Sequence, residues 1–473
     1  MSLASVFFIF IFLPTTLILY YLFRSRAWRN GVMTLASFVF FVWLDPSHLP
    51  QLIVFILVNY GIGMWVGYLI EKGNRAGSRI VMWLGVCLDL LGLIFYKYLG
   101  FLESIYSTLF HRDTSSSSIA LFLGISYLTF SAISYLVDVY RGTEKSEKNL
   151  MTLATYFVMF PKLMQGPITR YAEVSKALTA PTRIDTMGMM EGARRFIIGL
   201  AKKIIIADSL AIATNKVFNN PFYEIGAGVA WFGLIAYALQ IYFDFSGYTD
   251  MAIGLGRMFG FTLPENFNYP YISRSITEFW RRWHMSLINW FRTYLFIPLE
   301  FMRRHEKFLR QQTNLLIVFL LTGLWHGPSW NYILWGVYFG LILAIEASGW
   351  GKRLARLPVF VQRLYTTFLL LMGWVFFKIS SISRWGAFFK ALFGVNGWSN
   401  VATLRTKNIL FYAPIMILAI ILCTPALANL QNKAVARGEI FRLLFDIGYL
   451  LVFVFAVFYL VANGYNAFIY GRF

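Results

Sequence analysis

Two of the five histidines in this chain stand beside strongly apolar sequence, where an ionisable side chain is costly. His326 lies in "LTGLWHGPSWNYILWG". About twelve helical residues from Asn314 to Trp325 would rise roughly 18 Å, less than the approximately 30 Å of a bilayer core. We therefore expect His326 inside the membrane, where burial keeps an imidazole neutral and able to accept a proton. A buried histidine that only hydrogen-bonds a neighbouring helix is the alternative.

Two helix breaks are predicted near the middle of the chain. Pro328 disfavours helix at Gly327 and suits the first turn of a new helix, so the chain should break beside His326 and restart toward Trp330. The stretch "LMTLATYFVMFPKLMQGPITRY" is apolar but too short and too interrupted by proline and glycine for an ordinary span. It predicts a re-entrant segment, and such backbone survives at membrane depth only where protein or a water-filled cavity satisfies it.

The second histidine, His284, lies in "RSITEFWRRWHMSLINWFR", after the irregular approach "ENFNYPYI". Helical spacing would place Trp280 and His284 on one face and would let Glu278 pair with Arg282. A cationic, aromatic helix with one histidine indicates a wall at the membrane interface. An amphipathic anchor with snorkelling arginines is the alternative.

Other polar residues are weaker candidates. Asp244, in "LQIYFDFSGYTDMAIG", is an acid near the end of an apolar run, so it should face a cavity or hold a basic partner. His48, His111 and His305 fall in polar loops or at their edges, and we expect them at the surface. No pair of histidines on adjacent turns stands near a carboxylate, so no metal is expected.

Composition indicates an all-α polytopic membrane protein. Hydrophobic residues make up 58% of the chain, charged residues 14%, and mean hydropathy is +0.61. Apolar runs recur from end to end and predict roughly eleven transmembrane helices, plus re-entrant and interfacial helices. We expect one integral membrane domain over 1–473, with an N-terminal helical bundle at 1–140, a core at 150–350 and C-terminal helices at 360–473.

The net charge of +20 does not indicate nucleic acid binding, because the basic residues sit mainly in short loops between apolar runs. Their alternation predicts a multi-pass protein with its N-terminus outside and its basic loops in the cytoplasm. The segment "EGARRFIIGLAKKIIIADSL" predicts either an interfacial helix or an oblique span whose lysines snorkel.

Five stretches together resemble the membrane-bound O-acyltransferase family, in its bacterial alginate O-acetyltransferase branch: "EFWRRWHMSLINWFR", "GLWHGPSWNYILWG", "YFDFSGYTDMAIGLG", "NFNYPYIS" and "FPKLMQGPITRY". The resemblance implies an enzyme of the bacterial inner (cytoplasmic) membrane, built around a central funnel or tunnel. It implies that His326 and His284 are catalytic. The candidate substrate-binding residues are Trp283, Arg281, Arg282, Asp244, Trp325, Asn331 and Gln165.

The same resemblance implies the chemistry. An acyl group, most readily acetyl, would pass from a cytoplasmic thioester to a hydroxyl of an extracytoplasmic polysaccharide or partner acyltransferase. The donor would be acetyl-CoA or an acyl carrier. No bound cofactor is expected. This sequence departs from the branch at "EFMRRHEKFLR", which replaces a glycine-rich turn, and at Phe339. D-alanyl transfer toward teichoic acid is therefore an alternative, and a non-catalytic transporter or scaffold is an alternative of another class.

Overall fold

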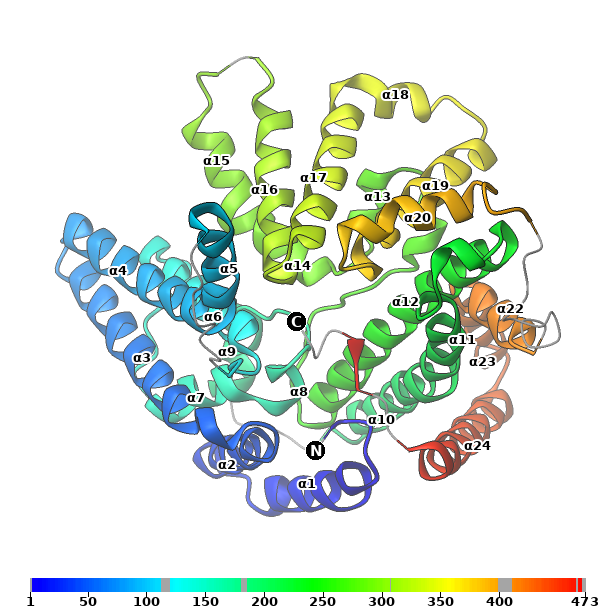
Figure 1. The fold of residues 1–473 in the computed structure, drawn as a ribbon. Coiled ribbons are helices and arrows are strands. Elements are labelled where there is room, and N and C mark those ends of the chain that lie inside the picture. Colours follow the sequence, from blue (N-terminus) through cyan, green and yellow to red (C-terminus); the bar gives the residue numbers. More distant parts are fainter. Residues whose placement is uncertain are drawn as a thin grey trace. The chain divides into compact units, whose positions relative to one another are not determined.

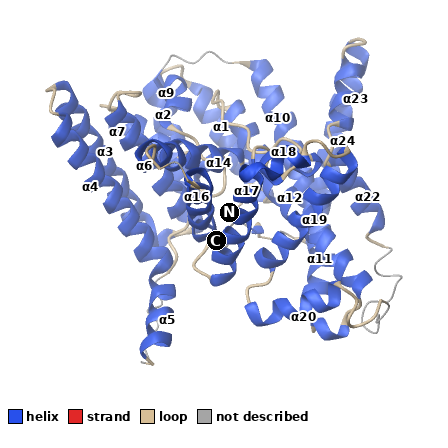
Figure 2. Ribbon diagram, turned by 90° about the horizontal axis from the view of Figure 1, so that it is seen from above, coloured by secondary structure: helices blue, strands red, loops and turns tan. Residues whose placement is uncertain are grey.

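The computed structural model of the protein describes residues 2–111, 120–179, 185–306, 308–398, 411–464 and 467–469. Within these ranges the regular elements are helices, and the only β-type pairing is an isolated bridge between Phe267 and Trp283 (Figure 2). The all-α class expected from the sequence is confirmed.

The chain forms two compact units. The first comprises Met1–Phe196 and Thr249–Glu265, and the second comprises Ile197–Tyr248 and Asn266–Phe473. Helices α10 (Thr186–Ala201) and α12 (Ala227–Met258) contribute residues to both. The three-part division expected from the sequence stays a prediction.

The first unit packs around α6 (Ile125–Arg141), which contacts α3 and α4 and is buried along most of its length. Glycines allow these helices to approach closely, because a Cβ on Gly85 of α4 would stand 2.6 Å from Leu136 of α6. The other helices here are α1 (Leu13–Leu22), α2 (Arg26–Leu44), α3 (Leu49–Glu71), α4 (Arg75–Leu93), α5 (Leu99–Phe110), α7 (Leu150–Val158), α8 (Phe160–Leu163) and α9 (Tyr171–Thr179). Two π-helical turns, Phe8–Phe12 and Ile94–Tyr98, precede α1 and α5.

The predicted break in the segment after residue 150 is confirmed, because α7 ends at Val158 and α8 has only four residues. The expectation that His48 lies at the surface is wrong. His48 is only 6% exposed, and its Nδ1 lies 2.7 Å from Asp45 Oδ1 while its ring stacks on Phe122. The nearby carboxylate allows the imidazole to be buried. The exposed positions of His111 and His305 are confirmed.

The second unit is organised around the hairpin of α16 (Arg310–His326) and α17 (Trp330–Ile345), which lie next to each other in Figure 1. Helices α13 (Ile276–Trp280) and α19 (Val359–Lys378) both pack on α17. The remaining helices are α11 (Asp208–Phe218), α14 (Met285–Phe291), α15 (Ile297–Met302), α18 (Gly351–Leu354), α20 (Ile382–Leu392), α22 (Ala413–Leu422), α23 (Ala426–Val435) and α24 (Glu439–Asn463). π-helical turns at Lys202–Ala207, Arg292–Phe296 and Glu346–Trp350 and short 3₁₀ turns at Pro46–His48, Phe222–Glu224 and Pro270–Ile272 complete the helical elements of the two units.

The backbones of α16 and α17 touch. A Cβ added to Gly323 would lie 2.3 Å from the Tyr332 carbonyl oxygen, and one added to Gly336 would lie 2.3 Å from the Phe319 carbonyl oxygen. Helices in lipid gain little from apolar burial against each other, so small residues at the contact supply close van der Waals packing instead. This contact fixes the hairpin that carries His326 at its turn.

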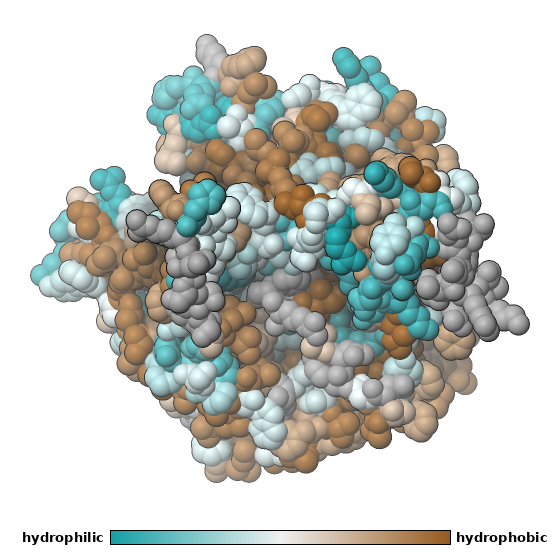
Figure 3. All heavy atoms as spheres, in the orientation of Figure 1, coloured by the Kyte–Doolittle hydropathy of each residue, from teal (hydrophilic) through white to brown (hydrophobic). Residues whose placement is uncertain are grey.

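Among the described residues, seven helices are long and apolar enough to cross a membrane, and an eighth span results if α22 and α23, bent by 65°, count as one. The expected number of about eleven is not confirmed, because several apolar segments are short or broken. Apolar side chains cover much of the face in view (Figure 3), and α24 exposes residues such as Leu451 and Phe458, as lipid contact requires.

Gly336→Ala should destabilise the second unit, because the new methyl group has no room against the Phe319 carbonyl. Overpacking of this kind costs about 1 to 3 kcal/mol, so the melting temperature of the purified protein in detergent should fall. Gly448→Ala on α24 is the matched control, since nothing lies within 4 Å of a Cβ there. Equal melting temperatures for the two variants would contradict the proposed backbone contact.

Candidate active site

His326 stands at the turn of the α16–α17 hairpin. Helix α16 ends at His326, Gly327 is extended, and α17 begins at Trp330, so the break predicted beside this ring is confirmed. The imidazole is 3% exposed and contacts the rings of Trp335 and Phe377, with centroids 5.0 and 5.3 Å away. An aromatic cage of this kind places the ring in an apolar setting.

His284 has an unusual backbone. Helix α13 ends at Trp280, and His284 adopts the left-handed conformation, φ 46° and ψ 51°, before α14 starts at Met285. The expectation that Trp280 and His284 share the face of one helix is therefore wrong. The bridge between Phe267 and Trp283 pulls the chain out of helical geometry, and the Met285 N–H donates to the Asn266 carbonyl.

The His284 side chain is enclosed, with 1% of its surface exposed. Its Nδ1 lies 3.0 Å from Asn266 Oδ1, which also accepts from the Ser286 N–H at 3.2 Å and from the Ser286 hydroxyl at 2.9 Å. Its Nε2 has no hydrogen-bond partner among the described residues. Burial lowers the pKa of His284, which lies outside the seven candidate spans, to about 3. The ring is thus neutral at physiological pH.

The two histidines meet at one indole. The ring of Trp325 lies 5.9 Å from that of His284 and 5.1 Å from that of His326, centroid to centroid. The ring of Phe245 on α12 also packs on His284 at right angles, with the two ring centroids 4.7 Å apart. The structure therefore brings together the two histidine motifs that the sequence singled out.

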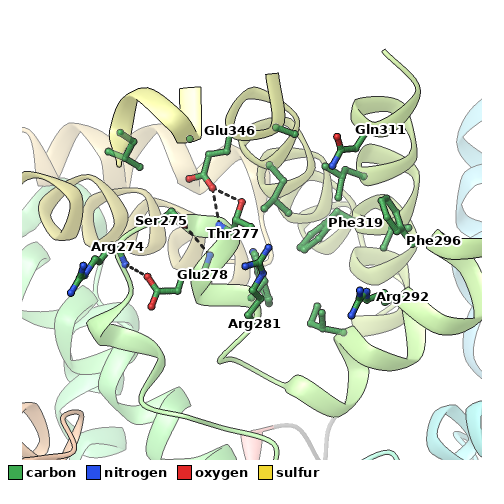
Figure 4. Close-up of a pocket in the computed structure, with 18 of the residues that line it drawn as sticks. Arg274, Ser275, Thr277, Glu278, Arg281, Arg292, Phe296, Gln311, Phe319 and Glu346 are labelled. Carbon is green, nitrogen blue, oxygen red and sulfur yellow. Dashed lines mark hydrogen bonds between the residues drawn. The ribbon is translucent and has the colours of Figure 1, made fainter. Parts of the chain in front are cut away.

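A cavity of about 980 Å³ lies in the second unit, beside α13, α14, α16 and α17 (Figure 4). Trp280 and Phe319 form part of its aromatic wall, and Trp280 contacts Trp335, which in turn contacts His326. Neither histidine lines this cavity. The expected funnel leading to His326 is thus not confirmed, and aromatic rings stand between the cavity and the imidazole.

Cations outnumber acids in the lining of the cavity. Arg274, Arg281, Arg292 and Lys352 line it, and none of them is paired with a carboxylate in the part of the chain that the structure describes. The two acids in the lining are already engaged. Glu278 pairs with Arg282 at 2.9 Å, and Glu346 accepts from two backbone N–H groups at the start of α13. The cavity is therefore suited to an anionic ligand.

Glu346 anchors the segment that leads to His284. Its carboxylate accepts from Ile276 N–H at 2.9 Å and from the N–H and hydroxyl of Thr277 at 2.8 and 2.6 Å. An acid that accepts from orphan amides at a helix N-terminus is favourably placed. Sequence reasoning missed Glu346 and Asn266. The only available signals were an acid that ends an apolar run and an asparagine between two prolines.

The candidate substrate-binding residues have different locations. Arg281 lines the cavity, whereas Arg282 pairs with Glu278 and Trp283 is buried against Phe279 and Trp374. Asn331 donates to the Phe376 carbonyl beside the hairpin turn. Gln165 belongs to the first unit, where it is 4% exposed. Of these candidates, Trp325 is the residue whose ring contacts both histidines.

Asp244 holds a basic partner, as expected. Lys203 Nζ lies 2.8 Å from both Asp244 and Asp208, and Asp244 Oδ2 accepts from the Ile469 N–H. Lys203 is 1% exposed, so it does not snorkel. Burial disfavours the charge of Lys203, but the two carboxylates outweigh that effect and raise its pKa. Burial raises the pKa of Asp208 to about 6, although the nearby charge of Lys203 acts in the opposite direction. This triad ties α12 to the C-terminal segment.

No three His, Cys, Asp or Glu side chains gather closely enough to hold a metal ion among the described residues. The site offers two buried imidazoles, with cations and aromatic rings beside them. Such a set can accept a proton and can hold an anionic ligand.

Comparisons with known proteins agree with this chemistry. The model of the membrane-bound O-acyltransferase family matches residues 85–383. The chain is 40% identical over 398 residues to the probable alginate O-acetylase of Pseudomonas aeruginosa, covering 83% of this chain and 74% of that protein. It is 30% identical over 426 residues to the peptidoglycan O-acetyltransferase of Helicobacter pylori (83% and 80%) and 31% identical over 328 residues to the teichoic acid D-alanyltransferase of Bacillus subtilis (65% and 77%).

Lys203→Met should destabilise the protein by roughly 3 to 5 kcal/mol, because it leaves two buried carboxylates without their cation. Without Lys203 the folded state binds protons more readily than the unfolded state, so the loss should be smaller at pH 5 than at pH 8. Melting temperatures across this range test the effect. Lys202→Met is the neighbouring control, and a loss that does not depend on pH would contradict the assignment.

Proposed function

This chain belongs to the membrane-bound O-acyltransferase family and is a multi-pass membrane O-acyltransferase, and from that premise we propose that it moves an acetyl group from acetyl-CoA to a hydroxyl. The observation that carries this proposal is the meeting of His326 and His284 at Trp325, in a buried site near a cationic cavity. Family membership favours an enzyme over the transporter or scaffold alternative.

The charge of the cavity supports a thioester donor that carries phosphates. Its four cations, which have no acidic partner among the residues that the structure describes, would bind the phosphates of acetyl-CoA. Its volume of about 980 Å³ is at the upper end of the range for small-molecule sites. The segments 303–310 and 351–358 contain several arginines. By the positive-inside rule we propose that they face the cytoplasm, and the alternation of basic and non-basic loops over the first 150 residues supports an N-terminus outside.

In the proposed mechanism, neutral His326 acts as the general base. The hydroxyl oxygen of the acceptor attacks the thioester carbonyl while the imidazole takes its proton. The carbon–sulfur bond then breaks, and the departing thiolate takes the proton from the imidazolium, so the products are the ester and free coenzyme A. In an alternative mechanism His326 first attacks the thioester and forms an acyl-imidazole, which labelled donor without acceptor would trap on the protein.

The acceptor is proposed from chemistry and from the relatives. An enzyme that keeps the charged donor on one side and transfers only its acyl end can modify a polysaccharide, or a partner acyltransferase, on the extracytoplasmic face of a bacterial inner membrane. Relatives named for alginate and peptidoglycan acetylation fit this proposal. The teichoic acid D-alanyltransferase relative supports D-alanyl transfer as the second candidate.

His326→Ala should abolish turnover of acetyl-CoA by the purified protein, since removing a general base costs about 10²- to 10⁴-fold in rate. The measurement is release of the free thiol from acetyl-CoA with an alginate oligosaccharide as acceptor. A parallel assay replaces acetyl-CoA with a D-alanyl thioester of a carrier protein as donor. His305→Ala, which alters an exposed histidine, is the control. Full activity of the His326 variant would overturn the proposed site.

Arg281→Ala should raise KM for acetyl-CoA roughly tenfold and change kcat little, because a charge-assisted contact to a phosphate is lost. Arg282→Ala is the matched neighbour, since Arg282 is paired with Glu278 and does not line the cavity. The effect of Arg281 should shrink at high salt. An unchanged KM together with a reduced kcat would argue against donor binding at this arginine.

A further inference from the structure

The side-chain oxygen of Asn266 is fixed as an acceptor by the backbone. It lies 3.2 Å from the Ser286 N–H, a group that can only donate, so the oxygen rather than the nitrogen of the amide faces this point. The same oxygen lies 3.0 Å from His284 Nδ1. A hydrogen bond to that oxygen requires a proton on Nδ1, because two acceptors cannot bond each other.

The proton on Nδ1 determines what the other ring nitrogen can do. His284 is neutral because burial lowers its pKa, so it carries one ring proton, and Nε2 keeps its lone pair. Nε2 is buried and has no partner among the described residues. A buried polar atom without a partner is costly and is a common sign of a site that a ligand or a water completes.

We propose that Asn266 is a positioning residue that holds His284 as the Nδ1–H tautomer, so that Nε2 is a hydrogen-bond acceptor for a second hydroxyl of the acceptor molecule, next to the attacking hydroxyl that gives its proton to His326. This inference rests on the proposed function for its catalytic meaning. It excludes one role for the second histidine. A neutral imidazole with its proton committed to Asn266 cannot donate a hydrogen bond to the thioester carbonyl, so His284 orients the nucleophile rather than polarising the donor.

The backbone around the pair supports a positioning role. His284 is held at φ 46°, a conformation uncommon for residues other than glycine. Backbone hydrogen bonds at the bridge between residues 267 and 283 hold it there: the Met285 N–H donates to the Asn266 carbonyl, and the Asn268 N–H donates to the Arg282 carbonyl. The segment that supplies the acceptor thus also sets the direction of the ring. Strain maintained in this way is typical of functional positions.

Asn266→Ala and Asn266→Asp test the proposal in the full-length purified protein. The alanine variant loses the orienting acceptor, so kcat with acetyl-CoA and an alginate oligosaccharide should fall by about 10- to 100-fold with an unchanged KM for acetyl-CoA. The aspartate variant keeps the acceptor and should retain most of kcat at high pH. Asn268→Ala, an exposed neighbour in the same loop, should behave as wild type.

The pH profile separates positioning from general damage to the fold. In the wild type, no acid limb from His284 is expected above pH 5, because its pKa is about 3. A carboxylate at position 266 favours the imidazolium and raises that pKa, so an acid limb should move to higher pH in the aspartate variant. Wild-type kcat in the alanine variant, or an unshifted limb in the aspartate variant, would overturn the proposal.

A measurement without turnover distinguishes failure of this inference from failure of the proposed function. The sample is the inactive His326→Ala protein with nitrogen-labelled histidine rings, studied by NMR. The His284 signal is assigned as the one that disappears when His284→Gln is added. That signal should show a protonated Nδ1 and an unprotonated Nε2. A proton on Nε2 instead would overturn the inference whatever the donor is. The expected tautomer, together with a wild-type protein that does not turn over acetyl-CoA, would preserve the inference and reject the donor.

Discussion

The left-handed turn at His284 is the constraint on which the arrangement of the site depends. If α13 continued past Trp280 in helical geometry, the imidazole would follow the helix surface and would lose its contact with Asn266. The turn instead leaves Trp280 on the cavity wall and brings His284 to Trp325. The left-handed conformation of His284 thus directs Trp280 to the cavity and His284 to the indole that also contacts His326.

This division places two kinds of environment close together. The cavity side is rich in cations, and Glu278 and Glu346 are held by Arg282 and by the start of α13. The histidine side is aromatic and enclosed, so a ring there stays neutral. An acyl thioester has the same two halves, with a charged handle and a small neutral end, which is why the family assignment and the observed geometry fit each other.

The sequence predicts the parts of this site that local chemistry controls. The break after His326 follows from Pro328, whose ring and missing N–H act on the residues beside it. The turn at His284 is not predictable in that way, because helical spacing runs through "EFWRRWHMSL" and the interactions that break it come from Asn266, eighteen residues earlier. The partner of Asp244, Lys203, is 41 residues away and is equally invisible to local patterns. The number of spans stays a prediction, because hydropathy does not register where a short apolar run bends.

The close contact between α16 and α17 limits how an acyl group can reach His326. With Gly323 and Gly336 packed backbone to backbone, the seam below the hairpin turn has no room even for a methyl group. The rings of Trp335, Phe377 and Trp325 stand beside the imidazole, and rings can rotate where backbones cannot. The rate at which these side chains change rotamer could therefore set an upper limit on turnover that is independent of the acid–base step.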